Sequence, residues 1–328
     1  MRALYLTGDE TTEMREAPPP VPNSGEVLVD VSRAGLCGSD MHFWHGHFKL
    51  RALPIILGHE FTGTVVDGPG SGQRVAVNPM TTCETCTACT TGYRHLCAQR
   101  GLIGVHAEGG FAERVAVPER CLTPIPDTLA AEAAVLAEPL AVCVHTARVG
   151  LSRHRAPPGE TRVTVLGGGA IGLLCAMAFR EMGVAEVRLA EPNAGRRATA
   201  SMVLEADVYD PVAMDPGAET ADLVCDAVGS ATTRAAAMRL VRPGGTITHV
   251  GLQEADGGVD FLMLTRMEVT FVGTYCYNDA DFAEAVRLLA EGRVTPDGWT
   301  EVRPLTDGPQ SFRDVHEGRA PPKIILVP

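Results

Sequence analysis

The sequence contains almost no lysine. Lys49 and Lys323 are the only two in 328 residues, and arginine supplies the rest of the fixed positive charge. No block of basic residues is dense enough to follow a phosphate backbone, and the formal net charge is −12. Recognition of nucleic acid requires a concentrated positive surface, so we expect no nucleic-acid partner.

Long apolar runs are also missing. The first residues, MRALYLTGDETTEM, contain no apolar stretch between a basic start and a cleavage site, which argues against a secretory signal. No run of about 18 apolar residues occurs, so we expect no membrane-spanning helix. We therefore expect a cytoplasmic protein that has no membrane partner. Ten cysteines in that compartment should stay reduced, and this favours metal binding over disulfides.

The length is sufficient for two domains, and the patterns along the chain differ. GEVLVDVSRAGLC (25–37), FTGTVV (61–66) and RVAVNP (74–79) alternate apolar and polar residues between Pro- and Gly-rich breaks. This pattern predicts short antiparallel strands. Near Glu138 the apolar residues begin to recur at helical spacing, which predicts a change of architecture.

The middle of the chain predicts a doubly wound α/β domain over about 147–277. RVTVLGGG (162–169) is expected to be a strand, AIGLLCAMAFREMG (170–183) a helix and EVRLAEP (186–192) a second strand. Strand, helix and strand of this length make a parallel βαβ unit. The alternation continues with further strands and with a helix at 231–245, and a helix at 279–292 follows. We expect six parallel strands in all.

The last fifty residues return to short strands and turns. They are expected to complete the first domain, so that the α/β domain is inserted between residues 1–146 and 278–328. This gives two predicted domains, with boundaries at 146 and 277.

GGGAIG (167–172) fits the dinucleotide fingerprint G-x-G-x-x-G. Gly167 permits a tight turn, Gly169 lets the backbone approach the pyrophosphate, and Gly172, which follows Ile171, allows close packing of helix and strand. Glu191 lies at the end of the second strand, where a carboxylate accepts hydrogen bonds from ribose hydroxyls. We therefore predict NAD as the cofactor. Arg196, together with Arg197, keeps NADP open as the alternative, since arginines here can bind a 2′-phosphate.

CETCTACTTGYRHLC (83–97) places four cysteines in one loop with spacing C-x2-C-x2-C-x7-C. Four sulfur ligands leave no open coordination position, which is typical of a structural zinc site. The predicted ligands are Cys83, Cys86, Cys89 and Cys97. A catalytic zinc instead needs about three protein ligands and an opening.

Scattered residues supply the second set. Cys37, His59 and Glu60 lie in the predicted β-rich domain, and Glu138 lies near its end. Each is weak evidence alone. Together with the four-cysteine loop and the glycine fingerprint, in this order along the chain, they resemble the zinc-dependent medium-chain dehydrogenase/reductase family. The branch indicated contains the sorbitol, threonine and 2,3-butanediol dehydrogenases.

The resemblance implies a mainly β, GroES-like catalytic domain and a Rossmann domain. It implies that Cys37 and His59 bind a catalytic zinc, with Glu60 and Glu138 as direct or water-linked ligands in an order left open. It further implies a proton relay from Ser39 through the cofactor ribose to His42. The implied reaction transfers a hydride between NAD and a secondary alcohol of a diol, polyol, sugar or cyclitol, giving the ketone, in a homodimer or homotetramer.

Two departures bear on the substrate. Where sorbitol dehydrogenases carry a Tyr and an Arg-Tyr pair, this chain has Phe43 and Cys276-Tyr277. The missing donors favour a smaller or less polar alcohol. Two alternatives from other classes are a zinc-independent quinone or enoyl reductase of the same fold, which usually lacks these ligands, and a noncatalytic zinc-binding protein, against which the complete glycine fingerprint argues.

Overall fold

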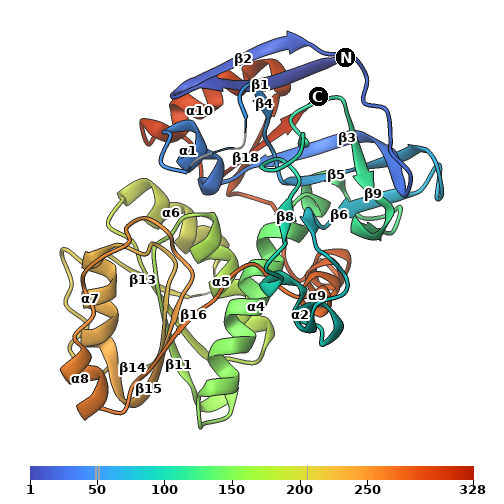
Figure 1. Ribbon diagram of the computed structural model, residues 1–328. Coiled ribbons are helices and arrows are strands. Elements are labelled where there is room, and N and C mark those ends of the chain that lie inside the picture. Colours follow the sequence, from blue (N-terminus) through green and yellow to red (C-terminus); the bar gives the residue numbers. More distant parts are fainter. Residues whose placement is uncertain (49, 51, 205) are drawn as a thin grey trace. The chain divides into compact units, whose positions relative to one another are not determined.

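The computed structural model describes residues 1–48, 50, 52–204 and 206–328, which form two compact units. The first unit comprises Met1–Glu138, Asn278–Pro296 and Thr300–Pro328, and the second comprises Pro139–Tyr277 and Asp297–Trp299. Both ends of the chain belong to the first unit (Figure 1). The domain boundaries at 146 and 277 stay a prediction.

A seven-stranded sheet organises the first unit. Its hydrogen-bonded order is β10 (Leu122–Pro124), β6 (Arg74–Val77), β5 (Glu60–Asp67), β3 (Glu26–Leu36), β18 (Lys323–Val327) and β17 (Thr300–Pro304), and β9 (Arg114–Pro118) also pairs with β3. All of these pairs are antiparallel except β17 with β18. The sheet therefore joins strands from opposite ends of the sequence.

The alternation in β3 explains how this sheet forms a core. Val27 and Val29 are fully buried on one face, whereas Leu28 and Asp30 between them are half-buried. Period-two patterning of this kind places one face of a strand against the core. The apolar face packs into a cluster that includes Phe61. The antiparallel β architecture predicted for the first part of the chain is confirmed.

Smaller elements complete the first unit. They are a three-stranded sheet of β2 (Thr11–Glu16), β1 (Arg2–Gly8) and β4 (Ile55–Ile56), the pair β7 (Met80–Thr81) and β8 (Gly101–Leu102), and the helices α1 (Gly38–Trp44), α2 (Thr87–Thr90), α3 (Ala131–Ala134), α9 (Asp279–Ala290) and α10 (Gly308–His316). The short 3-10 turns are η1 (Arg94–Leu96), η2 (Glu119–Cys121), η3 (Pro158–Glu160, in the second unit) and η4 (Leu305–Asp307).

Helix α10 differs from the expectation of only strands and turns after residue 292. Its first turn contains Gly308 and Pro309, a pair that resembles a turn signal in the sequence. Proline is also tolerated in the first turn of a helix, because the N–H groups of that turn have no partner within the helix. Phe312, fully buried, packs this helix into the core.

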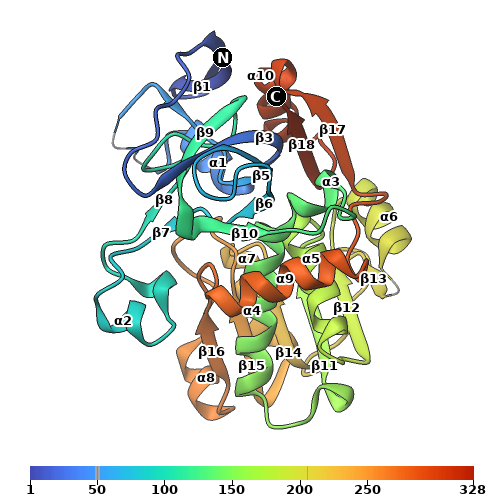
Figure 2. The ribbon, with the colours of Figure 1, turned by 90° about the vertical axis from the view of Figure 1, so that its right-hand side faces the viewer.

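A six-stranded parallel sheet organises the second unit. Its order is β13 (Asp207–Tyr209), β12 (Glu186–Ala190), β11 (Arg162–Leu166), β14 (Ala221–Asp226), β15 (Val241–His249) and β16 (Thr270–Gly273). Its helices are α4 (Ala137–Arg153, which starts at the end of the first unit), α5 (Ala170–Glu181), α6 (Ala194–Val203), α7 (Ala231–Leu240) and α8 (Phe261–Arg266). Helices α4 and α5 lie on one face and α7 on the other (Figures 1 and 2). The predicted doubly wound sheet is confirmed.

One element boundary within this sheet differs from the expectation. The helix predicted over 231–245 ends at Leu240, and β15 begins at Val241 rather than near Thr246. The register between β14 and β15 shifts between Ala221 and Leu223, so the Pro- and Gly-containing segment runs as irregular strand. No helix in the described ranges has the length and apolar character needed to cross a membrane.

Candidate metal centres and nucleotide site

The four cysteines of the loop at 83–97 converge. The Sγ atoms of Cys86 and Cys89 are 3.5 Å apart, those of Cys83 and Cys97 are 3.5 Å apart, and those of Cys83 and Cys89 are 3.9 Å apart. Sulfurs placed about 2.3 Å from a tetrahedral zinc ion are separated by about 3.8 Å. The four residues therefore fit a zinc ion with a closed coordination shell.

The electrostatics of this loop also suit a cation. Backbone N–H groups of Thr85 and Cys86 lower the pKa of Cys83 to about 6. Loss of solvation, followed by hydrogen bonds from the neighbouring sulfurs, raises the pKa of Cys89 to about 11. Four thiolates this close together repel one another, and a divalent cation at their centre removes that penalty.

Arg94 braces the loop from within the same unit. Its Nη1 lies 3.1 Å from Oδ2 of Asp279 at the start of α9, and its Nη2 forms a short contact with Glu84. The Arg94 side chain is 24% exposed and that of Asp279 is 59% exposed. The brace thus connects the four-cysteine loop to a helix far away in the sequence.

A second cluster forms where two neighbouring strands meet. Cys37 directly follows β3, His59 directly precedes β5, and Glu60 is the first residue of β5. One potential ligand atom from each of these residues lies within 4.8 Å of the others. A thiolate, an imidazole and a carboxylate fit a zinc site that leaves a position open. The structure therefore brings together three of the four residues predicted for the catalytic zinc.

Glu138, the fourth, is buried in the first turn of α4. It belongs to the same compact unit as the other three but is not part of their group within 4.8 Å, as far as the described residues show. Its role as a ligand stays a prediction.

Ser39 lies between two of the clustered residues. Its hydroxyl is 3.2 Å from Sγ of Cys37 and 3.1 Å from Nε2 of His59. The side chain comes from the first turn of α1, the helix that follows Cys37. A hydroxyl in this place can exchange a proton with a group bound beside the cluster.

Asp40 contacts two residues of the cluster, Cys37 and His59. Its Oδ2 accepts a hydrogen bond from the backbone N–H of Cys37 at 2.9 Å, and its Oδ1 lies 3.3 Å from Nδ1 of His59. Burial lowers the pKa of His59, but the charge of the fully buried Asp40 outweighs burial, and the pKa lies well above its usual value. The pairing of Nδ1 with Asp40 leaves Nε2 of His59 directed to the ligand group.

Lys323 is the residue that the sequence did not reveal. Its buried ammonium group lies 2.9 Å from Oε1 and 2.7 Å from Oε2 of Glu60. Burial lowers the pKa of Lys323, but the charges of Glu60 and then of Cys37 outweigh burial, and the pKa is raised. One of only two lysines, placed in the apolar segment KIILVP, was the available signal.

His42 lies in the last turn of α1. Burial, followed by the charges of His47 and His45, holds the pKa of His42 below its usual value. The ring packs against Phe48 with centroids 4.8 Å apart and lies 6.0 Å from the His47 ring. The imidazole is therefore neutral at physiological pH and can accept a proton. The relay from Ser39 to His42 stays a prediction.

The glycine fingerprint joins β11 to α5 as predicted. Gly167 has φ of +102°, and Gly169 is the N-cap of α5. A Cβ on Gly172 would lie 1.8 Å from the carbonyl oxygen of Gly167, so no side chain fits there. The half-buried Ile171 lies on the first turn of α5. The N-terminus of α5, with its unpaired N–H groups, suits a phosphate.

Glu191, at the end of β12, is fixed beside this turn. Its Oε2 accepts a hydrogen bond from the N–H of Gly168 and its Oε1 accepts one from the N–H of Asn193, both at 2.7 Å. Arg197 is engaged locally, since it donates to the carbonyl oxygen of Glu191 at 3.0 Å and pairs with Asp210 at 3.1 Å. Arg196 is exposed. A carboxylate at this place can accept hydrogen bonds from ribose hydroxyls.

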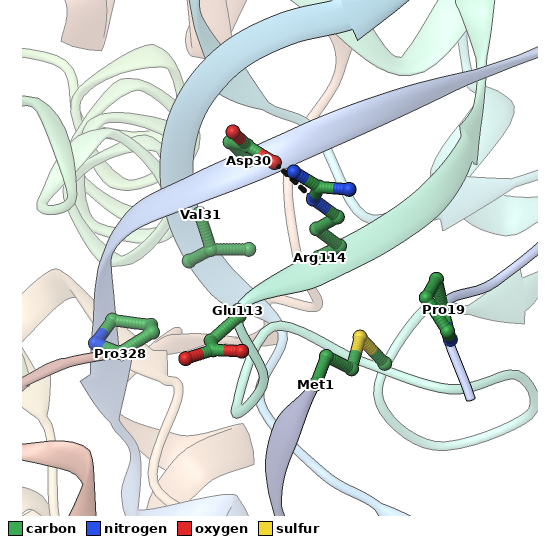
Figure 3. A pocket seen from close by; sticks show the side chains of 7 residues that line it. All are labelled: Met1, Pro19, Asp30, Val31, Glu113, Arg114 and Pro328. Atoms are coloured by element: carbon green, nitrogen blue, oxygen red, sulfur yellow. Dashed lines mark hydrogen bonds and ion pairs between the residues drawn. The ribbon is translucent and has the colours of Figure 1, made fainter. Parts of the chain in front are cut away.

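A separate cavity of about 460 Å³ in the first unit is lined by the two chain ends and by neighbouring strands. Figure 3 shows Met1, Pro328 and the Asp30–Arg114 ion pair around it, with Nε and Oδ1 2.6 Å apart. Within the described part of the chain, its lining includes none of the predicted site residues. The two clusters and the glycine turn thus remain the candidate functional sites.

Comparison with known proteins agrees with these observations. Residues 23–127 match the family model for the alcohol dehydrogenase GroES-like domain, and residues 170–291 match that for zinc-binding dehydrogenases. The chain is 35% identical to an L-galactonate-5-dehydrogenase of Escherichia coli K12, over 85% of this chain and 84% of that protein.

Two further proteins extend the comparison. A 2-dehydro-3-deoxy-L-galactonate 5-dehydrogenase of Pseudoalteromonas atlantica is 30% identical over 96% of this chain and 95% of its own length. A protein from Sinorhizobium meliloti 1021, solved with NADP bound, superimposes with a TM-score of 0.88 at 29% identity, over 100% of this chain and 99% of that one.

Proposed function

This chain belongs to the zinc-dependent medium-chain dehydrogenase family, and from that premise we propose that it oxidises a secondary alcohol of a polyol or sugar acid to the ketone, with NAD as the hydride acceptor. The observation that carries the proposal is the convergence of Cys37, His59 and Glu60, whose potential ligand atoms lie within 4.8 Å of one another. Hydride transfer to NAD requires an alcohol that loses its proton easily. A zinc ion held by these three residues would lower the pKa of the alcohol and so meet this requirement.

Cys37 and His59 would hold a catalytic zinc, with Glu60 or Glu138 as a further ligand. The zinc supplies Lewis-acid polarisation of the alcohol oxygen, which lowers the pKa of the alcohol. Asp40 keeps the His59 ring oriented from the opposite side. A second zinc, at the four-cysteine loop, would have a structural role in the same catalytic domain, residues 1–146 and 278–328.

The proton of the alcohol would leave through this chain's own side chains. Ser39, whose hydroxyl lies 3.1 Å from Nε2 of His59, would accept it first. His42 would then receive it, because its lowered pKa keeps the imidazole neutral and able to act as a base. Ser39 and His42 would thus move the proton, and a bound NAD would supply the hydride acceptor.

NAD is favoured over NADP by Glu191. A 2′-phosphate would meet a carboxylate already fixed by two backbone N–H groups, and like charges so close repel strongly. The engagement of Arg197 with Asp210 removes one cation from that position. The NADP bound to the Sinorhizobium protein and the exposed Arg196 make NADP preference the alternative to be tested.

The substrate class comes from two directions. The two curated relatives named above act, by their names, on sugar acids at carbon 5. Phe43 lacks the hydroxyl, and Cys276 lacks the guanidinium, that sorbitol dehydrogenases have at these positions, and both losses favour a smaller or less polar alcohol. The names of the relatives therefore place hexonic acids first among the substrates to be assayed, and the missing donors place small diols ahead of hexitols and cyclitols.

A homodimer or homotetramer in the cytoplasm completes the proposal. Strand β16 lies at the end of the six-stranded order, so one of its edges is available for pairing with another chain. Phe261 and Leu262, in the helix that precedes β16 along the chain, are 76% and 67% exposed. Light scattering on the purified protein tests this association, and a monomer would contradict it.

The decisive experiment combines metal analysis with a cofactor assay. We expect two zinc ions per chain and alcohol-dependent formation of NADH, with kcat/KM for NAD exceeding that for NADP. One zinc per chain and no turnover on hexonic acids, hexitols, diols or cyclitols would reject the proposal. Turnover with a preference for NADP would reject only the assignment of Glu191.

A further inference from the structure

The ammonium group of Lys323 donates all of its hydrogen bonds to acceptors within the first unit. Its Nζ donates to Oε1 and Oε2 of Glu60 at 2.9 and 2.7 Å and to the carbonyl oxygen of Leu36 at 3.2 Å. An ammonium group has three N–H donors, so all three are engaged. The side chains of Lys323 and Glu60 are 2% and 0% exposed. Each charge therefore has the other as its partner in place of water.

The backbone is arranged to admit this pair. Gly35 in β3 lies opposite Glu60 in β5, and a Cβ on Gly35 would lie 2.1 Å from Oε2 of Glu60. A side chain at position 35 would occupy the space that the carboxylate fills. Leu36, which receives the third hydrogen bond, directly precedes Cys37. Lys323 thus connects both strands that carry the clustered residues.

The Glu60 carboxylate nevertheless lies within 4.8 Å of the ligand atoms of Cys37 and His59. One carboxylate is therefore within reach of two cations, the Lys323 ammonium and a zinc ion. We propose that Lys323 is a positioning residue that competes with the zinc for Glu60, so that Glu60 binds the ion only transiently and a position stays available for the substrate. This rests on the proposed function, because it requires zinc at Cys37 and His59.

The physical reason is the cost of an unpaired buried charge. Without Lys323, the buried Glu60 carboxylate would keep the zinc as its remaining cation, and leaving such a charge unpaired costs several kcal/mol. Glu60 would then become a permanent ligand. Removal of Lys323 would therefore make the protein bind zinc more tightly. Removal of a residue that merely stabilises the fold would instead weaken zinc binding.

The rate of zinc release distinguishes these two roles without any activity assay. The full-length, zinc-loaded protein is mixed with an excess of a colorimetric chelator, and the phase that disappears in Cys37→Ala is assigned to the cluster. We expect Lys323→Met to slow this phase by roughly tenfold or more, the range that outer partners of metal ligands control. The matched control is Arg33→Met. It removes the half-buried ion pair between Arg33 of β3, in the same sheet as Lys323, and Glu132 of α3, and it should leave this release phase unchanged.

Two further variants complete the test. Lys323→Met/Glu60→Gln, which removes both charges, should restore the wild-type release rate. Glu60→Gln alone leaves the Lys323 ammonium buried without its partner beside the zinc, so it should release zinc faster than the double variant does. A hundredfold acceleration in the double variant would show that Glu60 is already a permanent ligand, and this result would overturn the proposal even if Lys323→Met did not fold.

Unchanged or faster release in Lys323→Met would also overturn it. A Cys37→Ala protein that releases zinc with the same phases as wild type would reject the proposed function and this inference together. If Cys37→Ala removes a zinc-release phase but Lys323→Met does not slow that phase, only the role of Lys323 is rejected.

Discussion

The two candidate metal sites of the first unit are built in opposite ways. The four-cysteine loop draws all its ligands from residues 83–97, and its sulfurs are partnered by one another and by local backbone N–H groups. The cluster at Cys37 takes its residues from the ends of two strands, and buried charges on other strands and on a helix surround it.

A difference of this kind is expected between a zinc site that stabilises structure and a zinc site that takes part in a reaction. Four identical ligands close the shell and require little support, because each neutralises part of the ion directly. A mixed set of ligands that leaves a position open needs neighbouring residues that fix each ligand. Here Asp40 contacts His59, and Lys323 contacts Glu60. The predictions below test whether the two clusters differ in this manner.

The largest effect should come from Cys37→Ala. We expect kcat/KM to fall by about a thousandfold or more, since the metal stabilises charge that develops on the alcohol oxygen. The zinc content should fall from two to one per chain and the melting temperature should change little. Kinetics, metal analysis and calorimetry measure these, and an active Cys37→Ala protein would contradict the catalytic assignment.

The contrasting change at the loop is Cys89→Ala. It should lower the melting temperature by about 10 °C, because a zinc bound to the folded state stabilises it by mass action. Activity below the transition should fall less than stability does. A stable, folded and inactive Cys89→Ala protein would instead place chemistry at the four-cysteine loop.

A smaller effect is expected from Asp40→Asn. It retains the shape of the side chain but removes the charge opposite Nδ1 of His59, so zinc affinity at the cluster should fall roughly 10- to 100-fold. Competition with a chelator of known affinity measures this. The loop zinc serves as an internal control, and equal weakening of both ions would indicate general unfolding.

The smallest effect should follow Arg94→Met. The partners Asp279 and Glu84 both have exposed side chains, so loss of the two ion pairs together should cost about 1 kcal/mol or less. Thermal unfolding measures the change, with Arg287→Met on α9 as a control that leaves the loop untouched. Loss of zinc from the loop in Arg94→Met would show that the brace, rather than the four sulfurs, holds it together.

The features that the sequence predicted are those with local signals. The four-cysteine spacing and the glycine turn each lie within about one turn or loop, where spacing alone fixes which atoms can meet. The alternation of strands and helices likewise predicted the parallel sheet, and the comparisons confirm the family and its fold.

The features that it did not predict depend on distant pairing. The partners Glu60 and Lys323 are 263 positions apart in the sequence. The Glu60 carboxylate has room to lie in its position because Gly35, opposite it in the neighbouring strand, has no side chain. Helix α10 was missed for a different reason, since its Gly-Pro start has the same composition as a turn. Neither the periodicity nor the composition of a segment records its cross-strand partners.

The position of β18 in the sheet has a consequence for the order of events during synthesis. Strands β3 and β5 emerge from the ribosome early, whereas β18, with Lys323, is made only after the whole parallel-sheet unit. The four-cysteine loop and the glycine turn can therefore be complete while Glu60 still lacks its cation. Because domains fold as units as the chain grows, we expect the nucleotide-binding half to mature before the reactive cluster, which becomes competent last.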